Sequence, residues 1–168
     1  MTLAARLPPL FVLAVMLHTA VLPQFRVAGV APDLLLLLGI AAGIAAGPDR
    51  GAIVGFTAGL LADCFLQTPF GLSALTYSLV GYAVGMFQTT ILHAALWIPV
   101  TTAVVASALG VVLFAVTGAV VGQAHLLSNR LVTVVLVVSL VNGLLFLFVA
   151  RPVRWATTAD LAPGLVLR

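Results

Sequence analysis

The sequence predicts an all-α membrane protein, a bundle of about six transmembrane helices with both termini in the cytoplasm. Three observations predict the membrane bundle: 63% of the 168 residues are hydrophobic, only 7% are charged, and the mean hydropathy is +1.29. A soluble domain has roughly 45–50% apolar and 25% charged residues. In lipid, an isolated segment satisfies its backbone hydrogen bonds internally only as a helix, so each long apolar run is expected to be helical.

About six apolar runs are bounded by proline, glycine or charged residues. They cover residues 8–22, 33–47, 51–66, 70–88, 95–121 and 129–150. The second and third runs are about 15 residues long, or about 22 Å, against a hydrocarbon core of about 30 Å. We therefore expect the bilayer to thin locally or neighbouring helices to shield these two runs.

The breaks between the runs follow from local chemistry. Pro23 ends the first run, Thr68-Pro69 follows the third, and Arg151-Pro152 closes the sixth. Between the second and third runs, Gly47 can end a helix with positive φ, Pro48 prevents its continuation, and Asp49 can cap the next helix. This break favours a tight helical hairpin, although one fused span, and thus five helices, is the alternative.

The distribution of arginine predicts the orientation. The chain contains no lysine, and its arginines alternate between the two sides of a six-span topology: Arg6, Arg50, Arg151, Arg154 and Arg168 against Arg26 and Arg130. The richer side is expected to be cytoplasmic, and Trp97 and Trp155 fall on it as interfacial anchors. Residues 1–150 are then one polytopic transmembrane domain, and residues 151–168 a short cytoplasmic tail. Because the arginines are scattered singly, they do not indicate nucleic-acid binding.

Glycines recur at four-residue intervals in the second and third runs. They are Gly39, Gly43 and Gly47, followed by Gly51, Gly55 and Gly59. Each set lies on one helix face, where the missing side chains let two backbones approach closely. We interpret these faces as packing surfaces, either within the hairpin or against a partner's helix. The same spacing recurs at Gly81/Gly85 and Gly118/Gly122.

Polar residues near the ends of the runs predict a second feature. Asp63 is costly in an apolar span unless it is paired or close to the interface. Asp33, Arg26 and Arg130 fall on the same outer side, so these four residues could form a polar cluster. Alternatively, Asp33 simply caps the second helix beside Pro32. Asn142 in the sixth run is expected to hydrogen-bond between helices.

No residue pattern indicates catalysis, a cofactor or a metal. Cys64 is the single cysteine, and His18, His93 and His125 are dispersed over different segments. The Gly71-Leu72-Ser73-Ala74 segment faintly resembles the serine loop of intramembrane proteases, but no histidine has a defensible place as its base. We therefore expect the protein not to be an enzyme.

The order of four segments resembles the MreD family of rod shape-determining proteins. These are residues 30–36 (VAPDLLL), 51–63 (GAIVGFTAGLLAD), 68–75 (TPFGLSAL) and 80–82 (VGY). The positions that match the family's motifs are Pro32, Asp33, Gly55, Gly59, Asp63, Pro69 and Gly71. One departure is the loop at 88–93, which lacks the cationic residues expected of a cytoplasmic loop in this family.

The resemblance implies a non-catalytic, multi-pass subunit of the bacterial inner membrane. It would bind the bitopic protein MreC, and act through it with MreB, RodA and a class B penicillin-binding protein in peptidoglycan synthesis and cell shape. The family is also similar in architecture to the substrate-binding subunits of energy-coupling-factor vitamin transporters. That alternative requires several polar or aromatic residues converging on a pocket.

Overall fold

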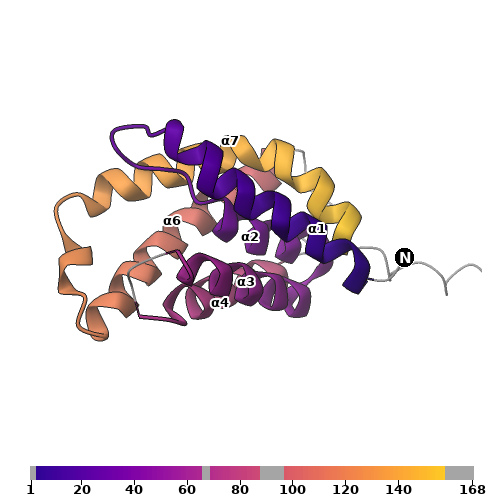
Figure 1. The fold of residues 1–168 in the computed structure, drawn as a ribbon, viewed down its shortest axis with the longest axis horizontal. Coiled ribbons are helices and arrows are strands. Elements are labelled where there is room, and N and C mark those ends of the chain that lie inside the picture. Colours follow the sequence, from indigo (N-terminus) through magenta and orange to yellow (C-terminus); the bar gives the residue numbers. More distant parts are fainter. Residues whose placement is uncertain (1–2, 66–68, 88–96, 158–168) are drawn as a thin grey trace, which may run out of the picture.

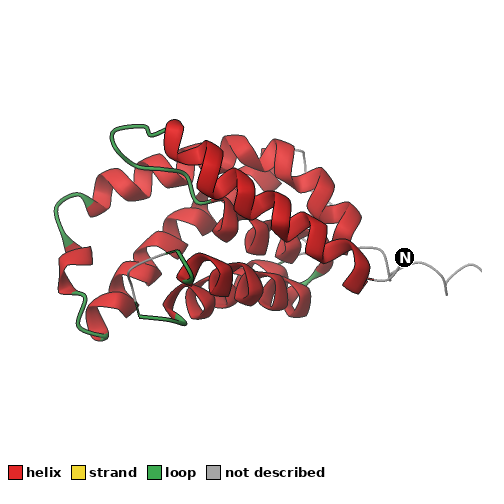
Figure 2. Cartoon of the chain, viewed as in Figure 1, coloured by secondary structure: helices red, strands yellow, loops and turns green. Residues whose placement is uncertain are grey.

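The computed structural model describes residues 3–65, 69–87 and 97–157. The regular structure in these ranges is helical, as predicted (Figure 2). The α-helices are α1 (Leu3–Met16), α2 (Leu34–Ala46), α3 (Pro48–Asp63), α4 (Leu72–Met86), α6 (Trp97–Val120) and α7 (Leu131–Thr157). Short turns of other helix types cover Leu17–Val21, Leu22–Gln24 and Ala124–Leu127. The expected loop at 88–93, His93, and the tail from 158 with Arg168 lie outside the described residues.

Helix α2 lies at the centre of the bundle. In Figure 1, α1 and α7 lie on one side of it, and α3 and α4 lie on the other. Every residue from Leu34 to Ile44 is buried, as expected of a helix that is apolar all round. Its 13 residues span about 20 Å. Because protein covers this short helix, the expected shielding by neighbours is confirmed for the second run.

The turn between α2 and α3 forms as the sequence predicted, with one difference. Gly47 has a φ of +89°, ends α2 and serves as the N-cap of α3, and Pro48 is the first residue of α3. Asp49 was expected to cap this helix, but it lies in the first turn and its side chain makes no capping bond. At the start of α2, the Asp33 side chain accepts a hydrogen bond from the Leu36 amide at 3.0 Å, which confirms Asp33 as a helix cap.

Helix α7 does not end before Pro152, where the sequence predicted its closure. It continues to Thr157, with Pro152 inside the helix. Proline removes one main-chain hydrogen bond, but Val153 and Ala156 are completely buried, and that burial offsets the loss. Residues 151–157 therefore continue the last helix of the bundle.

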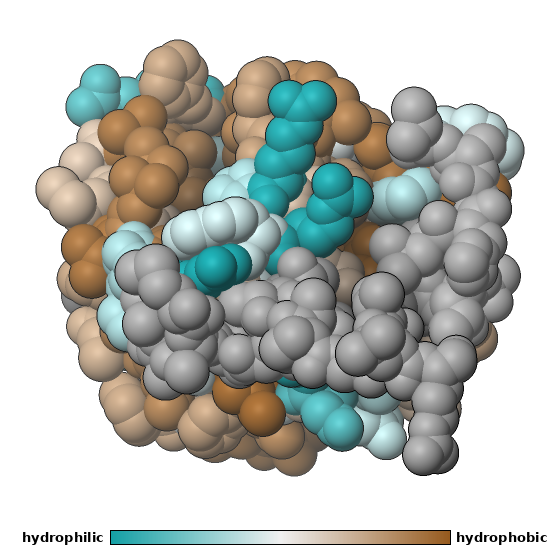
Figure 3. Space-filling model, turned by 90° about the vertical axis from the view of Figure 1, so that its right-hand side faces the viewer, coloured by the Kyte–Doolittle hydropathy of each residue, from teal (hydrophilic) through white to brown (hydrophobic). Residues whose placement is uncertain are grey.

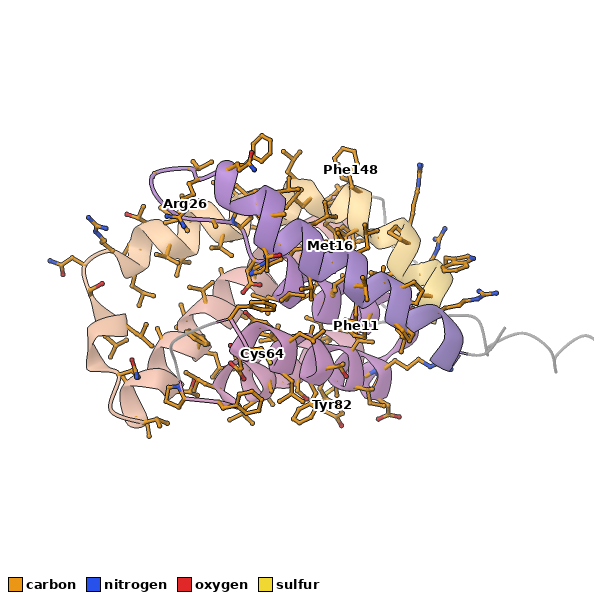
Figure 4. All side chains as sticks on the ribbon, in the orientation of Figure 1. Phe11, Met16, Arg26, Cys64, Tyr82 and Phe148 are labelled. Carbon is orange, nitrogen blue, oxygen red and sulfur yellow. The ribbon has the colours of Figure 1, made fainter. Side chains whose placement is uncertain are left out.

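Helices α6 and α7 are long and apolar enough to cross a membrane, by length and composition. They have 24 and 27 residues, with mean hydropathies of 2.3 and 2.7 in their most apolar windows. Large apolar side chains also cover the outer surface of the molecule. Phe148 and Tyr82 point outward on opposite sides in Figure 4, and Phe148 is 73% exposed. An apolar belt of this kind suits contact with lipid.

Candidate functional site

Glycines bring α2, α3 and α4 into backbone contact. We call this the glycine seam, formed by Gly39, Gly43, Gly51, Gly55 and Gly59 together with Gly81 and Gly85 of α4. A methyl group on Gly43 or on Gly51 would overlap the Gly81 carbonyl oxygen. Where side chains are absent, close approach yields dispersion contacts and weak Cα–H···O interactions.

The seam also joins the two helices of the hairpin. A Cβ on Gly39 would lie 2.9 Å from the Gly55 Cα, and one on Gly51 would lie 2.7 Å from the Gly43 Cα. Toward the other end of α3, a Cβ on Gly59 would lie 2.5 Å from the Ala74 nitrogen in α4. The glycine spacing in the sequence allows these faces to pack either within the chain or against a partner. In the structure, α4 of the same chain packs against both faces.

Asp63, at the C-terminal end of α3, binds the start of α4. Its carboxylate accepts hydrogen bonds from the amides of Gly71 (2.8 Å), Ser73 (3.0 Å) and Ala74 (3.3 Å). Gly71 is the N-cap of α4 with a φ of +99°, a backbone conformation that glycine adopts without strain. The side chain of Asp63 is 4% exposed. A buried carboxylate at a helix N-terminus is stabilised by these donors and by the helix dipole.

The two motif prolines lie just before the starts of α2 and α4, the helix starts that Asp33 and Asp63 cap. Pro69 lies two residues before Gly71, and its carbonyl accepts the Leu72 amide at 3.2 Å. Pro32 is buried and directly precedes Asp33. The motif positions that the resemblance singled out thus form the starts of α2 and α4 and the glycine contacts between α3 and α4.

Asp33 anchors a second polar group, which connects four helices. Its side chain accepts a hydrogen bond from the hydroxyl of Tyr77 in α4. Its main-chain oxygen accepts from Nδ2 of Asn142 in α7 at 3.0 Å, and the same amide lies 3.2 Å from Oγ of Ser107 in α6. Asn142 is fully buried, and the interhelical bonds predicted for it are confirmed.

Tyr77 and Ser107 were missed in the sequence analysis, although a signal for them was present. Both are polar residues inside an apolar run. In such a run every buried hydrogen-bonding group needs a partner. The partner is either a carbonyl of the same helix, as for Thr76 and Leu72, or a group on a neighbouring helix. The sequence does not indicate which helix provides that contact.

The structure does not bring the proposed four-residue cluster together. Asp33 and Asp63 bind the starts of two different helices, and the side chains of Arg26 and Arg130 are exposed. Arg26 lies in the loop ahead of α2, toward the end of the bundle away from the N-terminus (Figure 4). Within the described ranges, no ion pair joins either arginine to either aspartate.

Arginines gather at the opposite end of the bundle. Nη1 of Arg6 donates to the Trp155 carbonyl at 3.0 Å, and its guanidinium lies 4.5 Å from the centre of the Trp155 ring. Arg50 donates to the carbonyl of Thr157. Figure 3 shows this end, where hydrophilic side chains meet with hydrophobic surface around them. These contacts bring the start of α1, the start of α3 and the end of α7 together.

An apolar groove runs between α4 and α6. Two adjoining hollows of about 400 and 410 Å³ form it and share Ala83, Val84, Ala106 and Leu109. On α6 the lining extends from Thr101 to Val116, which is about 22 Å of helix. We call this feature the α4–α6 groove. Alanines along its floor leave room for the backbone of another helix.

The polar contacts described above fix helix starts or join helices, and four buried polar atoms have no hydrogen-bond partner among the described residues: Nε of Arg6, Nδ1 of His18, Oγ of Ser73 and Oδ1 of Asn142. In those ranges no cluster of three or more histidine, cysteine or acidic side chains could hold a metal ion. Cys64 is exposed and donates to the carbonyl of Leu60. The arrangement fixes helix starts and helix spacing, and it leaves apolar surface for contacts with lipid or with other helices.

Comparison with known proteins gives one match. The family model described as rod shape-determining protein MreD matches residues 2–151 of the chain. Searches of curated proteins and of solved structures give no match. The matched family is a shape-determining one and not a known enzyme family. The match gives no support to the vitamin-transporter alternative.

Proposed function

The chain belongs to the MreD family of rod shape-determining proteins, and on that premise we propose that it is a non-catalytic, multi-pass subunit of the bacterial inner membrane. In this role it binds an MreC-like bitopic protein. Through that protein it acts with MreB, RodA and a class B penicillin-binding protein to organise peptidoglycan synthesis during elongation. The observation that carries the proposal is the family match over residues 2–151.

The positions of the arginines support the proposed topology. Arg6 contacts Trp155 and Arg50 contacts Thr157, so these residues share one end of the bundle. By the positive-inside rule that end is the cytoplasmic one. This arrangement supports the proposal of an even number of membrane crossings with both termini in the cytoplasm.

The α4–α6 groove is the surface that we propose for the partner's transmembrane helix. The glycine seam cannot serve, because α4 fills it. The groove is concave, apolar and about as long as a short transmembrane segment, and its alanine floor allows close helix packing. Such packing would let the subunit bias the position or state of its partner by binding one arrangement more tightly than another.

Co-purification combined with crosslinking tests this proposal. A Cys64→Ser background receives one cysteine in the groove, Leu109→Cys, or one on the exposed face of α7, Leu140→Cys. Each variant is produced in membranes with an MreC homologue that carries a cysteine in its transmembrane helix. We expect the homologue to co-purify with both variants and to crosslink to Leu109→Cys but not to Leu140→Cys.

The possible failures have separate meanings. No co-purification would contradict binding of the MreC homologue. Co-purification with crosslinks only at Leu140→Cys would keep the partner and contradict the groove as its binding surface.

A further inference from the structure

A second cleft lies between α2, α6 and α7, away from the α4–α6 groove. Its volume is about 430 Å³, within the range of about 300–1,000 Å³ typical of ligand sites. Apolar side chains from all three helices line it, including Ile44 of α2, Val100 of α6 and Phe146 of α7. Ile44 and Phe146 are buried in the molecule, so the cleft has an apolar interior.

The cleft is charged at one end only. Arg151 and Arg154 are its charged lining residues, and both come from the last two turns of α7. From Phe146 to Arg154 the helix rises by about 12 Å, so the cleft passes from an apolar interior to a cationic mouth. That mouth belongs to the end of the bundle where Arg6 contacts α7.

Arg151 and Arg154 are three residues apart in α7, so their side chains are neighbours on one face of the helix. Two neighbouring guanidinium groups suit one phosphate, because guanidinium groups bind phosphate oxygens in bidentate fashion. Topology alone requires cationic residues at this end, but it does not require two of them beside one apolar cleft.

We propose that this cleft binds an anionic phospholipid, with one acyl chain along Ile44, Val100 and Phe146 and the phosphate at Arg151 and Arg154. Basic pockets between transmembrane helices on the cytoplasmic side recognise anionic head groups in this way. The occupant combines a long apolar chain with a negative head group, which matches the charge pattern of the cleft. The residues that line this cleft differ from those that line the α4–α6 groove.

Lipid binding to the purified full-length protein tests the proposal. The protein in uncharged detergent is titrated with phosphatidylglycerol, phosphatidylcholine or glycerol 1-phosphate. Native mass spectrometry then measures how many molecules of each compound are bound per protein. We expect phosphatidylglycerol to bind roughly tenfold more tightly than phosphatidylcholine, the ratio that one strong charge-assisted contact provides. Glycerol 1-phosphate, which lacks the acyl chain, should bind far more weakly.

Three variants locate the site. The double variant Arg151→Gln/Arg154→Gln should abolish the preference for phosphatidylglycerol. Ala150→Leu, which narrows the cleft and keeps both arginines, should weaken both lipids. Arg130→Gln removes an exposed arginine just before α7, at its opposite end, and should change nothing. If Ala150→Leu alters folding, the double variant decides, because its two substitutions lie on exposed positions.

Four results would overturn the proposal. They are equal binding of the two lipids by the wild-type protein, an unchanged preference in the double variant, an equal loss in Arg130→Gln, and binding of glycerol 1-phosphate as tight as that of the lipid. The last two would indicate unspecific attraction of anions to arginine.

Discussion

Replacing Gly51 by alanine tests the glycine seam directly. The new methyl carbon would overlap the Gly81 oxygen and lie 2.7 Å from the Gly43 Cα and 2.8 Å from the Gly81 carbonyl carbon. These are backbone atoms, so no side-chain rotation relieves the contact. To restore the usual separation of about 3.5–4.0 Å, α3 must move by roughly 1 Å from both neighbours.

The energetic cost follows from overpacking. Such insertions cost about 1–3 kcal/mol, and two backbones opposing the methyl group place this one at the upper end. Alanine has a higher helix propensity than glycine, which stabilises the variant by up to about 1 kcal/mol. The net destabilisation is then about 2 kcal/mol, or roughly 4–8 °C in unfolding temperature for a chain of this size.

Thermal unfolding in mild detergent, followed by the fluorescence of Trp97 and Trp155, measures this change. Gly110→Ala is the matched control. A Cβ there would meet the Leu36 Cδ2 atom at 2.9 Å, and that side-chain end can shift. We expect Gly110→Ala to stay within roughly 1 kcal/mol of the wild-type protein. Equal unfolding temperatures for the Gly51→Ala and Gly110→Ala variants would refute the close backbone contact of Gly51 with Gly43 and Gly81.

Three further substitutions probe the polar contacts, all measured by the same unfolding assay. Asp63→Asn weakens a carboxylate that accepts three amides and should cost about 1–3 kcal/mol; Asp49→Asn, at an exposed position, should cost less than about 0.5 kcal/mol. Tyr77→Phe removes the hydroxyl bond to the carboxylate that caps α2 and should cost about 1 kcal/mol, whereas Tyr82→Phe, at an exposed position, should be neutral. Asn142→Leu removes two interhelical bonds and should cost about 1 kcal/mol; an unchanged stability would show that those bonds contribute nothing.

Features set by neighbouring residues could be predicted from the sequence. Gly47 and Pro48 form the turn between α2 and α3, and Asp33 caps the helix that follows it directly. Each of these depends on main-chain geometry within a few positions. Asp63 differs because its carboxylate oxygens accept hydrogen bonds from amides that lie 8 to 11 residues further along the chain. Reading that contact requires knowledge of how α3 and α4 pack.

The packing faces could be predicted, but their neighbours could not. Glycines spaced four residues apart identify a helix face without side chains, but they do not identify the helix that packs against it. In the structure Gly81 and Gly85 of α4 supply the complementary face. Pro152 illustrates the converse case, because local chemistry predicts the end of a helix there and burial of Val153 beyond it keeps the helix intact.

The proposed role of this chain is to support rod shape by holding a partner helix between α4 and α6. The shape of bacterial cells depleted of their own MreD and supplied with variants of this chain tests that role. Wild-type protein and Leu140→Trp, altered on the exposed face of α7, should restore rods. Ala83→Trp, which fills the groove, should leave cells round while reaching the membrane at the wild-type level. Normal rods with Ala83→Trp would contradict the groove as the binding surface of the partner helix. Round cells with the wild-type chain would contradict the role of this chain in cell shape.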